Sequence, residues 1–229
     1  MRASLVFTLL LGSAIGFAAD SPLQAVFQRM DKASADFKGF TANLVKIDHS
    51  DIVDANDKSQ GTIAVRRVGP HNVQVLEKID TLNGKPDGEQ LELGTRFSVY
   101  HPKENLVIDY DLNKKYRGVE EAALALLGGS SKDLLQDYKV TYGSAETVEG
   151  KAASRLVLNP IDQTLAQQFP KIEVWISDAT GLAVQEKLYQ KGEKDYELQT
   201  YSNVQPGNVS DDQVKMNVPK NTRHQHQKQ

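Results

Sequence analysis

Histidine is the side chain most often used for acid-base catalysis and metal binding near neutral pH, and the chain has five of them. None stands at a spacing that would place it beside a nucleophile or a second metal ligand; they are His49, His71, His101, His224 and His226. The chain also lacks a Gly-x-Ser-x-Gly elbow, a His-Glu-x-x-His pair and a Gly-x-x-x-x-Gly-Lys phosphate loop. His224 and His226 could hold a stray metal ion, but a solvated polar tail explains them more simply. We therefore expect no catalytic residue, no metal site and no cofactor.

Acidic side chains lie close together at two places, where they could bind calcium or act as an acid-base pair. The first group resembles a calcium loop but lacks the glycine after Asn56 and the distal glutamate; it comprises Asp48, Asp51, Asp54, Asn56 and Asp57. We interpret it as a charged connection between two strands. The second group, Glu120 and Glu121, falls in the first turn of an expected helix, where the helix dipole already accounts for it.

The composition excludes several classes of protein. The 229 residues contain no cysteine, which rules out a disulfide framework, a thiolate metal site, a cysteine nucleophile and lipid attachment through cysteine. The 27 Lys and Arg residues are outnumbered by 30 Asp and Glu residues, so no excess of positive charge is present to bind a phosphate backbone. We therefore expect no nucleic-acid partner.

The N-terminus has the pattern of a secretory signal peptide. Arg2 precedes an apolar run of about a dozen residues, shorter than the roughly 20 that span a membrane, and Ala18 and Ala19 supply small residues for cleavage. We expect residues 1–19 to be a cleaved leader, 20–220 one soluble domain and 221–229 a disordered tail with nothing apolar to bury. A retained N-terminal anchor is the alternative for the first segment.

The elements that must position any site begin with a helix and continue mainly as strands. Ser21 and Pro22 have the order of a helix cap and first turn, and apolar residues follow at helical spacing. Short runs of β-branched and aromatic residues separated by turn signals such as Asn83-Gly84 then predict strands at 40–47, 61–67, 72–79, 89–93, 96–100 and 106–112.

Two short leucine-rich helices interrupt the strands. They are expected at 119–127 and after Ser131, joined by Gly128 and Gly129. The segment 161–169 could be a helical turn or a loop, and the remaining strands are expected at 138–142, 145–148, 154–158, 171–177, 182–190 and 195–201. Short strands joined by tight turns imply an antiparallel sheet, and these helices can cover only one of its faces. We therefore expect an α+β fold, in which a dry packed core is the simplest use of the covered face.

Several segments, taken in order, carry a family resemblance. After the first helix come Phe40-Thr-Ala-Asn-Leu and Gly61-Thr-Ile-Ala-Val-Arg-Arg, with Pro70 close behind. Later segments are Phe97-Ser-Val-Tyr-His-Pro with Asn105, the leucine-rich helices, Val174-Trp-Ile-Ser-Asp-Ala-Thr-Gly-Leu182 and Val214-Lys-Met-Asn-Val-Pro219. In this order and spacing they resemble the periplasmic outer-membrane lipoprotein carrier family (LolA-like) over nearly the whole chain after the leader.

This resemblance implies an incomplete antiparallel β-barrel, a curved half-barrel sheet whose concave face is covered by short α-helices. It also implies a soluble periplasmic monomer, not an enzyme, that shelters acyl chains of lipoproteins in a hydrophobic cavity and transfers them from the inner to the outer membrane. Its partners would be an inner-membrane ABC exporter and an outer-membrane acceptor. A carrier of another lipid, such as a glycolipid or a polycyclic lipid linked to a membrane transporter, and an envelope-stress lipoprotein sensor are the alternatives.

Strand alternation proposes residues that would line such a cavity. Ile63 and Val65 share one face with Arg67, and Val73 and Val75 share one face of the next strand. The other expected lipid-binding residues are leucines of the following strand and of the helix pair, namely Leu91, Leu93, Leu124, Leu127, Leu134 and Leu135. Ordinary core packing is the alternative for the leucines of the helix pair.

An inward Arg67 matches the latch arginine of the family. The resemblance implies that its guanidinium hydrogen-bonds carbonyls at the end of a lid helix and holds the empty cavity closed until lipid displaces it. Arg66 is the candidate if the strand register is shifted by one residue. A role for Arg67 as an exposed strand charge is the remaining alternative.

Overall fold

The computed structural model describes residues 21–69, 72–94, 96–110 and 127–227. The expected leader and Leu124 therefore lie outside the described residues. The first element is helix α1 (Pro22–Ala35), as predicted. The Ser21 hydroxyl accepts a hydrogen bond from the amide of Gln24 at 3.2 Å, and proline occupies the first turn, where its missing N–H costs nothing.

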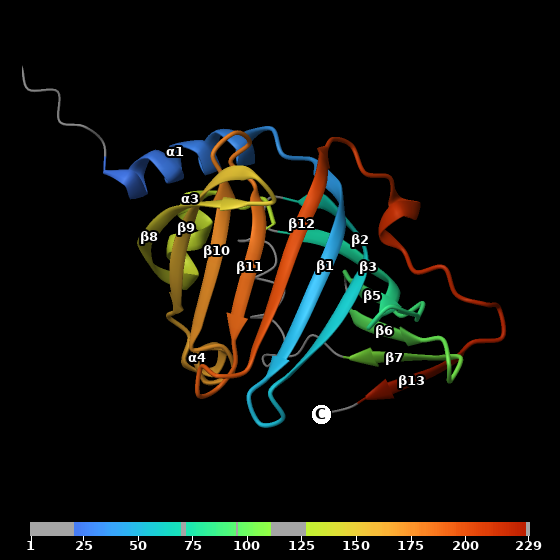
Figure 1. Ribbon diagram of the computed structural model, residues 1–229. Helices are drawn as coiled ribbons and strands as arrows, with labels where there is room; N and C mark the ends of the chain where they lie inside the picture. The colour runs from blue at the N-terminus through green and yellow to red at the C-terminus, as the bar shows by residue number, and fades with distance from the viewer. Residues whose placement is uncertain (1–20, 70–71, 95, 111–126, 228–229) are drawn as a thin grey trace, which may run out of the picture.

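One open, curved sheet makes up most of the described residues (Figure 1). Its strands run in the spatial order β13-β7-β6-β5-β3-β2-β1-β12-β11-β10-β9-β8, with β4 paired to β3. The sheet does not close, and among the described strands all pairs are antiparallel except β13 with β7. The α+β half-barrel is therefore as expected. The strands are β1 (Gly39–Ser50), β2 (Ala55–Gly69), β3 (Asn72–Leu82), β4 (Lys85–Pro86), β5 (Gln90–Leu93), β6 (Phe97–His101), β7 (Leu106–Tyr110), β8 (Tyr138–Val148), β9 (Lys151–Pro160), β10 (Lys171–Ser177), β11 (Ala183–Tyr189), β12 (Tyr196–Pro206) and β13 (Arg223–Gln227).

Tight turns with left-handed backbone connect several of the long strands. Asn83 and Gly84 have φ angles of 51° and 75° between β3 and β4, and Glu149 and Gly150 have 48° and 73° between β8 and β9. Two successive positive φ angles make the turn whose twist matches that of a hairpin, and Asn-Gly is its preferred sequence. The acidic stretch near Asp51 connects β1 to β2 by residues 51–54, as we interpreted it.

Within the described residues, three short helical pieces supplement α1: α3 (Ser131–Asp137), α4 (Gln163–Gln168) and the 3-10 turn η1 (Asp211–Val214). Ser130 and Asp133 form a capping box at the start of α3, where the second leucine-rich helix was expected. The segment 161–169, left open from the sequence, contains α4, and the Asp162 side chain accepts the amide of Leu165 at its start. No helix within the described ranges is long and apolar enough to cross a membrane.

The C-terminal tail corrects one prediction. Residues 223–227 are not disordered but form β13, which pairs in parallel with β7. The backbone amide and carbonyl groups along the edge of β7 bind a strand of any composition, so no apolar side chain is needed. His224 and His226 stand on either side of Asp109, at 3.5 and 3.8 Å from its carboxylate.

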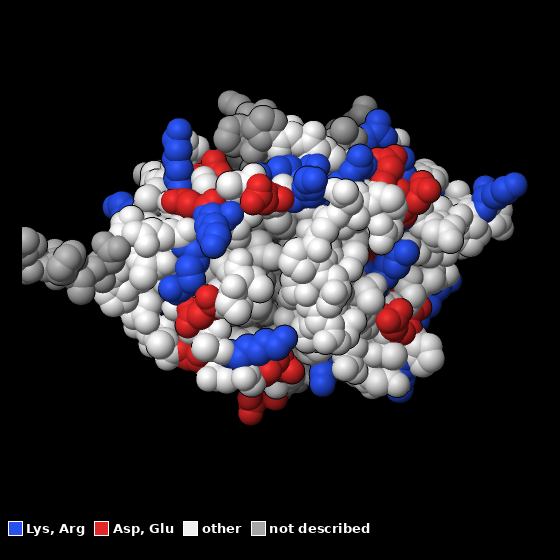
Figure 2. Space-filling view, turned by 90° about the horizontal axis from the view of Figure 1, so that it is seen from above, with Lys and Arg blue, Asp and Glu red and all other residues white. Residues whose placement is uncertain are grey.

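Two buried apolar clusters lie on the concave side of the sheet. The first packs α1 and α3 against β8 to β11 and includes Phe27, Leu134 and Ile172. The second lies on β1, β2, β3 and β5 and includes Phe40 and Leu93. Helix α1 runs across one end of the sheet (Figure 1), and Figure 2, which looks down on that end, shows Lys and Arg side chains mixed with Asp and Glu. This face therefore carries no single-sign charge.

Candidate functional site

A cavity of about 290 Å³ lies between the two apolar clusters. One wall comes from β3, β5 and β6, the opposite wall from α4, β10 and β11, and residues of β1 and β12 complete it. The volume is at the lower end of the roughly 300–1,000 Å³ that is usual for ligand sites. The described lining residues are Lys46, Val75, Glu77, Leu91, Leu93, Phe97, Leu127, Leu165, Phe169, Ile172, Glu186, Leu188, Gln190, Glu197, Gln199 and Tyr201.

Two larger hollows lie outside the concave interior. One of about 430 Å³ is on the convex face beside η1 and is lined mainly by polar side chains such as Asn43 and Gln205. The other, of about 510 Å³, adjoins the C-terminal end of α1 and includes Lys32 and Lys38. Both are more open to solvent than the cavity between the clusters. The cavity is therefore the better shelter for an apolar ligand.

The structure distributes the expected lining residues over several places. Val75, Leu91, Leu93 and Leu127 line the cavity. Ile63, Val65 and Val73 point to the same side and are fully buried in the second cluster, but they pack against its other members rather than facing the cavity. These side chains therefore lie on one face, and only part of that face reaches the open space. Their role in lipid binding stays a prediction.

The leucines of α3 were expected either to bind lipid or to pack in the core, and the structure places both outside the cavity. Leu134 is completely buried in the first cluster, and Leu135 is 48% exposed, so neither lines the cavity. Adjacent residues on a helix point in directions about 100° apart, and here Leu134 faces the core while Leu135 faces solvent. The start of α3 is also fixed to α1, because the Asp31 carboxylate accepts the amide of Ser131 at 2.7 Å and its hydroxyl at 2.9 Å.

Arg67 points into the concave side, on the same face as Ile63 and Val65. One guanidinium nitrogen, Nη1, donates to the Ser34 carbonyl at 3.0 Å. The other, Nη2, donates to the Ser34 hydroxyl at 3.2 Å and to the Gly128 carbonyl at 2.7 Å. The neighbouring Arg66 instead makes an ion pair with Asp211 of η1 on the other face. Arg67 thereby ties residue 128, which follows the expected helix 119–127, to the C-terminal turn of α1, where a cation is favoured. Its role as a latch stays a prediction.

Gly128 permits this contact. Its φ is +137°, and a Cβ added there would lie 2.5 Å from the ring of Phe37. The same ring lies 5.2 Å from the guanidinium carbon of Arg67. No other residue type fits this position without moving the Phe37 ring.

Six of the other lining residues form a polar end of the cavity, which sequence reasoning missed. We use this name for Lys46, Glu77, Glu186, Glu197, Gln199 and Tyr201. Lys46, Gln199 and Glu186 occupy paired positions on β1, β12 and β11, so they stand in one row across the sheet. The sequence does hold a signal for two of them. Residues two apart in a strand share a face, so Lys46 lies on the same face as the buried Leu44, and Glu77 on the same face as the buried Val75.

Lys46 is the cation of the polar end. Its ammonium lies 3.2 Å from Glu77 and 3.7 Å from Glu197. Burial by itself lowers the pKa of Lys46, but the Glu77, Glu197 and Asp48 carboxylates outweigh it and hold the pKa above its ordinary value. The ammonium therefore stays charged at neutral pH.

Glu186 is the carboxyl group of the polar end that holds a proton at neutral pH. Burial raises its pKa to about 8, with added repulsion from Glu197 and Glu77, so its carboxyl is mainly neutral at pH 7. Its Oε1 is 3.2 Å from the Tyr201 hydroxyl, which also lies 2.9 Å from Oε1 of Gln199. A protonated Glu186 can donate to the Tyr201 oxygen while the Tyr201 hydroxyl donates to Gln199.

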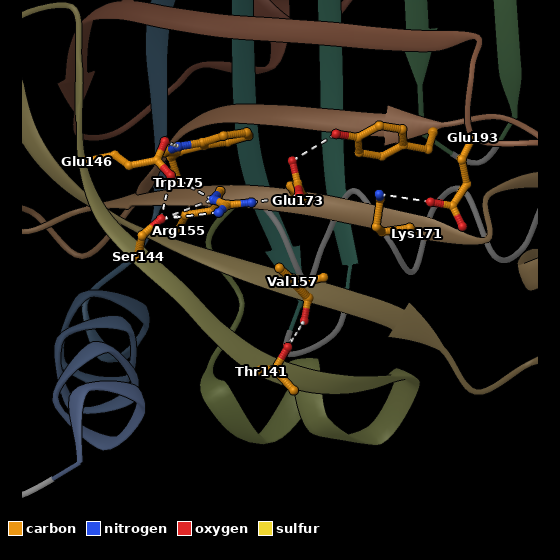
Figure 3. A network of polar contacts seen from close by, with 10 residues as sticks. Thr141, Ser144, Glu146, Arg155, Val157, Lys171, Glu173, Trp175 and Glu193 are labelled. Atoms are coloured by element: carbon orange, nitrogen blue, oxygen red, sulfur yellow. Dashed lines mark hydrogen bonds and ion pairs between the residues drawn. The ribbon is translucent and has the colours of Figure 1, made fainter.

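A second polar network lies on the opposite, convex face of the sheet (Figure 3). Arg155 bridges Glu146 and Glu173 at 2.7 Å each, and the Trp175 indole nitrogen donates to Glu146 at 2.6 Å. The Tyr189 hydroxyl donates to Glu173 at 3.0 Å, and burial raises the pKa of Tyr189 to about 12. These groups pair with one another across β8 to β11, so the network stabilises the sheet and leaves the cavity on the other side.

Comparison with known proteins shows the fold. Neither a protein-family model nor a curated protein sequence matches the chain. An uncharacterized conserved protein from Thermus thermophilus matches with a TM-score of 0.57 and 11% identity, over 90% of this chain and 100% of that one. MucB matches with a TM-score of 0.50 and 14% identity over 85% of this chain, which spans only 62% of the MucB chain. At such identities the likeness is one of fold alone.

A LolA superfamily protein from Nitrosomonas europaea is also similar, with a TM-score of 0.41 and 13% identity over 84% of this chain and 97% of that one. The open, curved antiparallel sheet of the described residues carries short helices on its concave side. This architecture is the incomplete barrel that the resemblance in the sequence implied.

Proposed function

We propose that the chain is a soluble periplasmic carrier that shelters acyl chains of lipoproteins in the cavity and transfers them from the inner to the outer membrane. The observation that supports this most is the cavity between the two apolar clusters, with leucine, valine and phenylalanine side chains on facing walls. Burial of a methylene group is worth about 0.8 kcal/mol, so a chain of roughly 14 carbons represents ~11 kcal/mol. Transfer through water needs such a shelter.

Arg67 gives the carrier a means of closing when it is empty. Its contacts with Ser34 and Gly128 are hydrogen bonds from a charged donor, each worth about 1.5–3 kcal/mol. Together they are smaller than, but comparable to, the gain from burying one acyl chain. Cargo can therefore displace the arginine, and reclosure of the arginine can in turn assist release.

The wider setting of the carrier is part of the same proposal. Residues 1–19 act as a cleaved leader, and the residues that follow form the single carrier domain, β13 included. An inner-membrane ABC exporter would load the monomeric carrier and an outer-membrane acceptor would unload it. Covalent chemistry is not required, because loading and release need only the exchange of apolar surfaces.

Uptake of a fluorescent acylglycerol tests the proposal with matched leucine variants. Leu91→Glu places a charge on the cavity wall and is expected to reduce binding at least about tenfold, because a buried carboxylate is costly beside an acyl chain. Leu135→Glu alters a leucine that is 48% exposed and is expected to bind like the unchanged chain. Equal loss in both variants, or no uptake by the unchanged chain, would contradict an acyl-binding cavity.

A further inference from the structure

We infer that the polar end of the cavity is a subsite for an uncharged, hydroxyl-bearing head group of the lipid cargo. The inference rests on the proposed acyl-chain carrier, because the apolar wall must hold the chain for a head group to reach this end. Polar and apolar lining belong to one continuous cavity, in which Leu188 of β11 lies two residues from Glu186 on the same face. The cavity therefore has an apolar part and a polar part, which match the tail and the head group of an amphiphilic ligand.

The polar end is not explained as a means of stabilising the fold. Moving charged groups out of water costs several kcal/mol each, and apolar residues of similar volume often give an equal or more stable core. The side chains of Lys46 and Glu77 are only 15% and 9% exposed, although both face an otherwise apolar concave side. Their presence on a cavity wall therefore points to a ligand.

The polar end offers donors and acceptors in one connected series. Gln199 donates from its amide nitrogen to Glu197 at 2.5 Å, and Lys46 joins Glu197 to Glu77. At the other end of the series, the Tyr201 hydroxyl lies between the Glu186 carboxyl group, at 3.2 Å, and the Gln199 amide oxygen, at 2.9 Å. A hydroxyl group both donates and accepts, so a head group with several hydroxyls can pair with either kind of partner along this series.

An anionic head group does not suit the same surface. Glu77 and Glu197 are carboxylates, and Glu186 is a third carboxyl group beside them, against the single ammonium of Lys46. A phosphate or carboxylate entering here would meet like charge where water screens it poorly.

A cationic head group is disfavoured for a different reason. The place between Glu77 and Glu197 is already occupied by the Lys46 ammonium. A second ammonium would have to lie beside the first, in a partly dry cavity. What remains is a neutral head with hydroxyls, such as a glycerol or sugar unit.

Three amphiphiles with the same dodecyl tail separate these cases: dodecyl glucoside, dodecyl phosphate and dodecylammonium. Each is titrated below its micelle concentration into the full protein by calorimetry. We expect the glucoside to bind at least about tenfold more tightly than either charged amphiphile. Equal binding of all three, or tighter binding of a charged one, would overturn the subsite and leave the acyl cavity standing. Failure of all three to bind would instead contradict the carrier itself.

Lys46→Met tests the role of the lysine, because it empties the cation position between the two carboxylates. We expect binding of dodecylammonium to strengthen about tenfold and binding of the glucoside to weaken. Lys171→Met is the matched control: it removes an ion pair with Glu193, 2.8 Å long, on the convex face (Figure 3), and should leave the preference unchanged. A Lys46→Met protein that keeps the original preference would contradict the inference.

Gln199→Leu provides a second variant should Lys46→Met not fold. It changes no charge and removes both a donor and an acceptor from the polar end. We expect glucoside binding to weaken about tenfold, with uptake of an unsubstituted alkane probe unchanged. Unchanged glucoside binding by this variant would also overturn the subsite.

Discussion

Arg66 and Arg67 are adjacent in β2, yet their side chains lie on opposite faces of the sheet and do different things. Arg67 reaches Ser34 and Gly128 on the concave side, and Arg66 reaches Asp211 on the convex side. Sequence alternation places one arginine inward but needs a family resemblance to choose between them. The structure makes the choice through the residues that each guanidinium contacts.

Replacement of Arg67 tests the latch. Arg67→Leu removes the hydrogen bonds that favour the closed, empty carrier, so we expect the variant to accept an acyl cargo but to transfer it several-fold more slowly. The measurement is the rate at which a fluorescent acyl cargo passes from the loaded protein to acceptor vesicles. Arg66→Leu removes an exposed ion pair instead and should transfer at the original rate. Normal transfer by Arg67→Leu would remove Arg67 from the mechanism.

Glu186 makes the stability of the fold depend on pH. Its pKa is raised to about 8 by burial, whereas a carboxyl group in the unfolded chain titrates near about 4.3. Between these values the unfolded chain releases a proton that the folded chain keeps. The free energy of unfolding therefore falls as pH rises through this range, by at most about 1.4 kcal/mol per pH unit from this group.

Glu186→Gln removes this contribution. We expect the unfolding free energy of the unchanged chain, relative to that of the variant, to fall between about pH 5 and about pH 8.5. Urea unfolding at the two pH values measures it, and Glu104→Gln, at an exposed glutamate, should show no such trend. A difference that is the same at both pH values would mean that Glu186 titrates normally.

Arg67 of β2 holds residue 128 against α1 through hydrogen bonds to the Gly128 and Ser34 carbonyls. Gly128→Ala would force an alanine to a φ of +137° and place its Cβ 2.5 Å from the Phe37 ring. We expect it to lower the unfolding free energy by about 2–4 kcal/mol, from backbone strain and overpacking together. Gly84→Ala is the control, because Gly84 also has a positive φ of 75° but open space around it, so it should show the strain alone. Equal losses in urea unfolding would exclude the close contact with Phe37.

Strand β13 covers an edge of the sheet. Removal of residues 221–229 takes away its backbone partners on β7, from Leu106 to Tyr110. We expect the amides of β7 that face β13 to exchange with deuterium at least about tenfold faster in the shortened chain. The amides of β9 that pair with β8 at the other end of the sheet serve as the control and should be unchanged. Unaltered exchange in β7 would show that the tail does not pair there.

The elements themselves were largely predictable. Cap residues such as Ser21 and turn pairs such as Asn83-Gly84 act locally, so the sequence shows them directly. The prediction of a disordered tail was wrong because β13 forms on the edge of β7, more than 100 residues earlier in the chain, and its own composition does not show this. For Leu134 and Leu135 the sequence left lipid binding and core packing open, because the rotation of α3 about its axis depends on its packing against α1 and β8; Leu134 enters the first cluster and Leu135 is 48% exposed.

Across the molecule, the half-barrel combines an apolar part, beneath α1 and along β1 to β5, with a polar end inside one cavity. The apolar part could be predicted from strand alternation and family resemblance. The polar end could not be predicted from the sequence, because Lys46, Gln199 and Glu186 come together only when β1, β12 and β11 pair in their observed register. Long-range register is the information that short sequence patterns lack.

Carriage of acyl chains in this cavity can be tested on the protein purified from cells that produce it. The experiment is to extract the purified protein with organic solvent and identify bound molecules by mass spectrometry. We expect acylated cargo in near-stoichiometric amount, with triacylated lipoproteins if the proposed transfer is right and hydroxyl-rich lipids if a free lipid is the cargo. A protein that carries no acylated molecule, and that takes up no acylglycerol when one is offered, would contradict the proposed carrier.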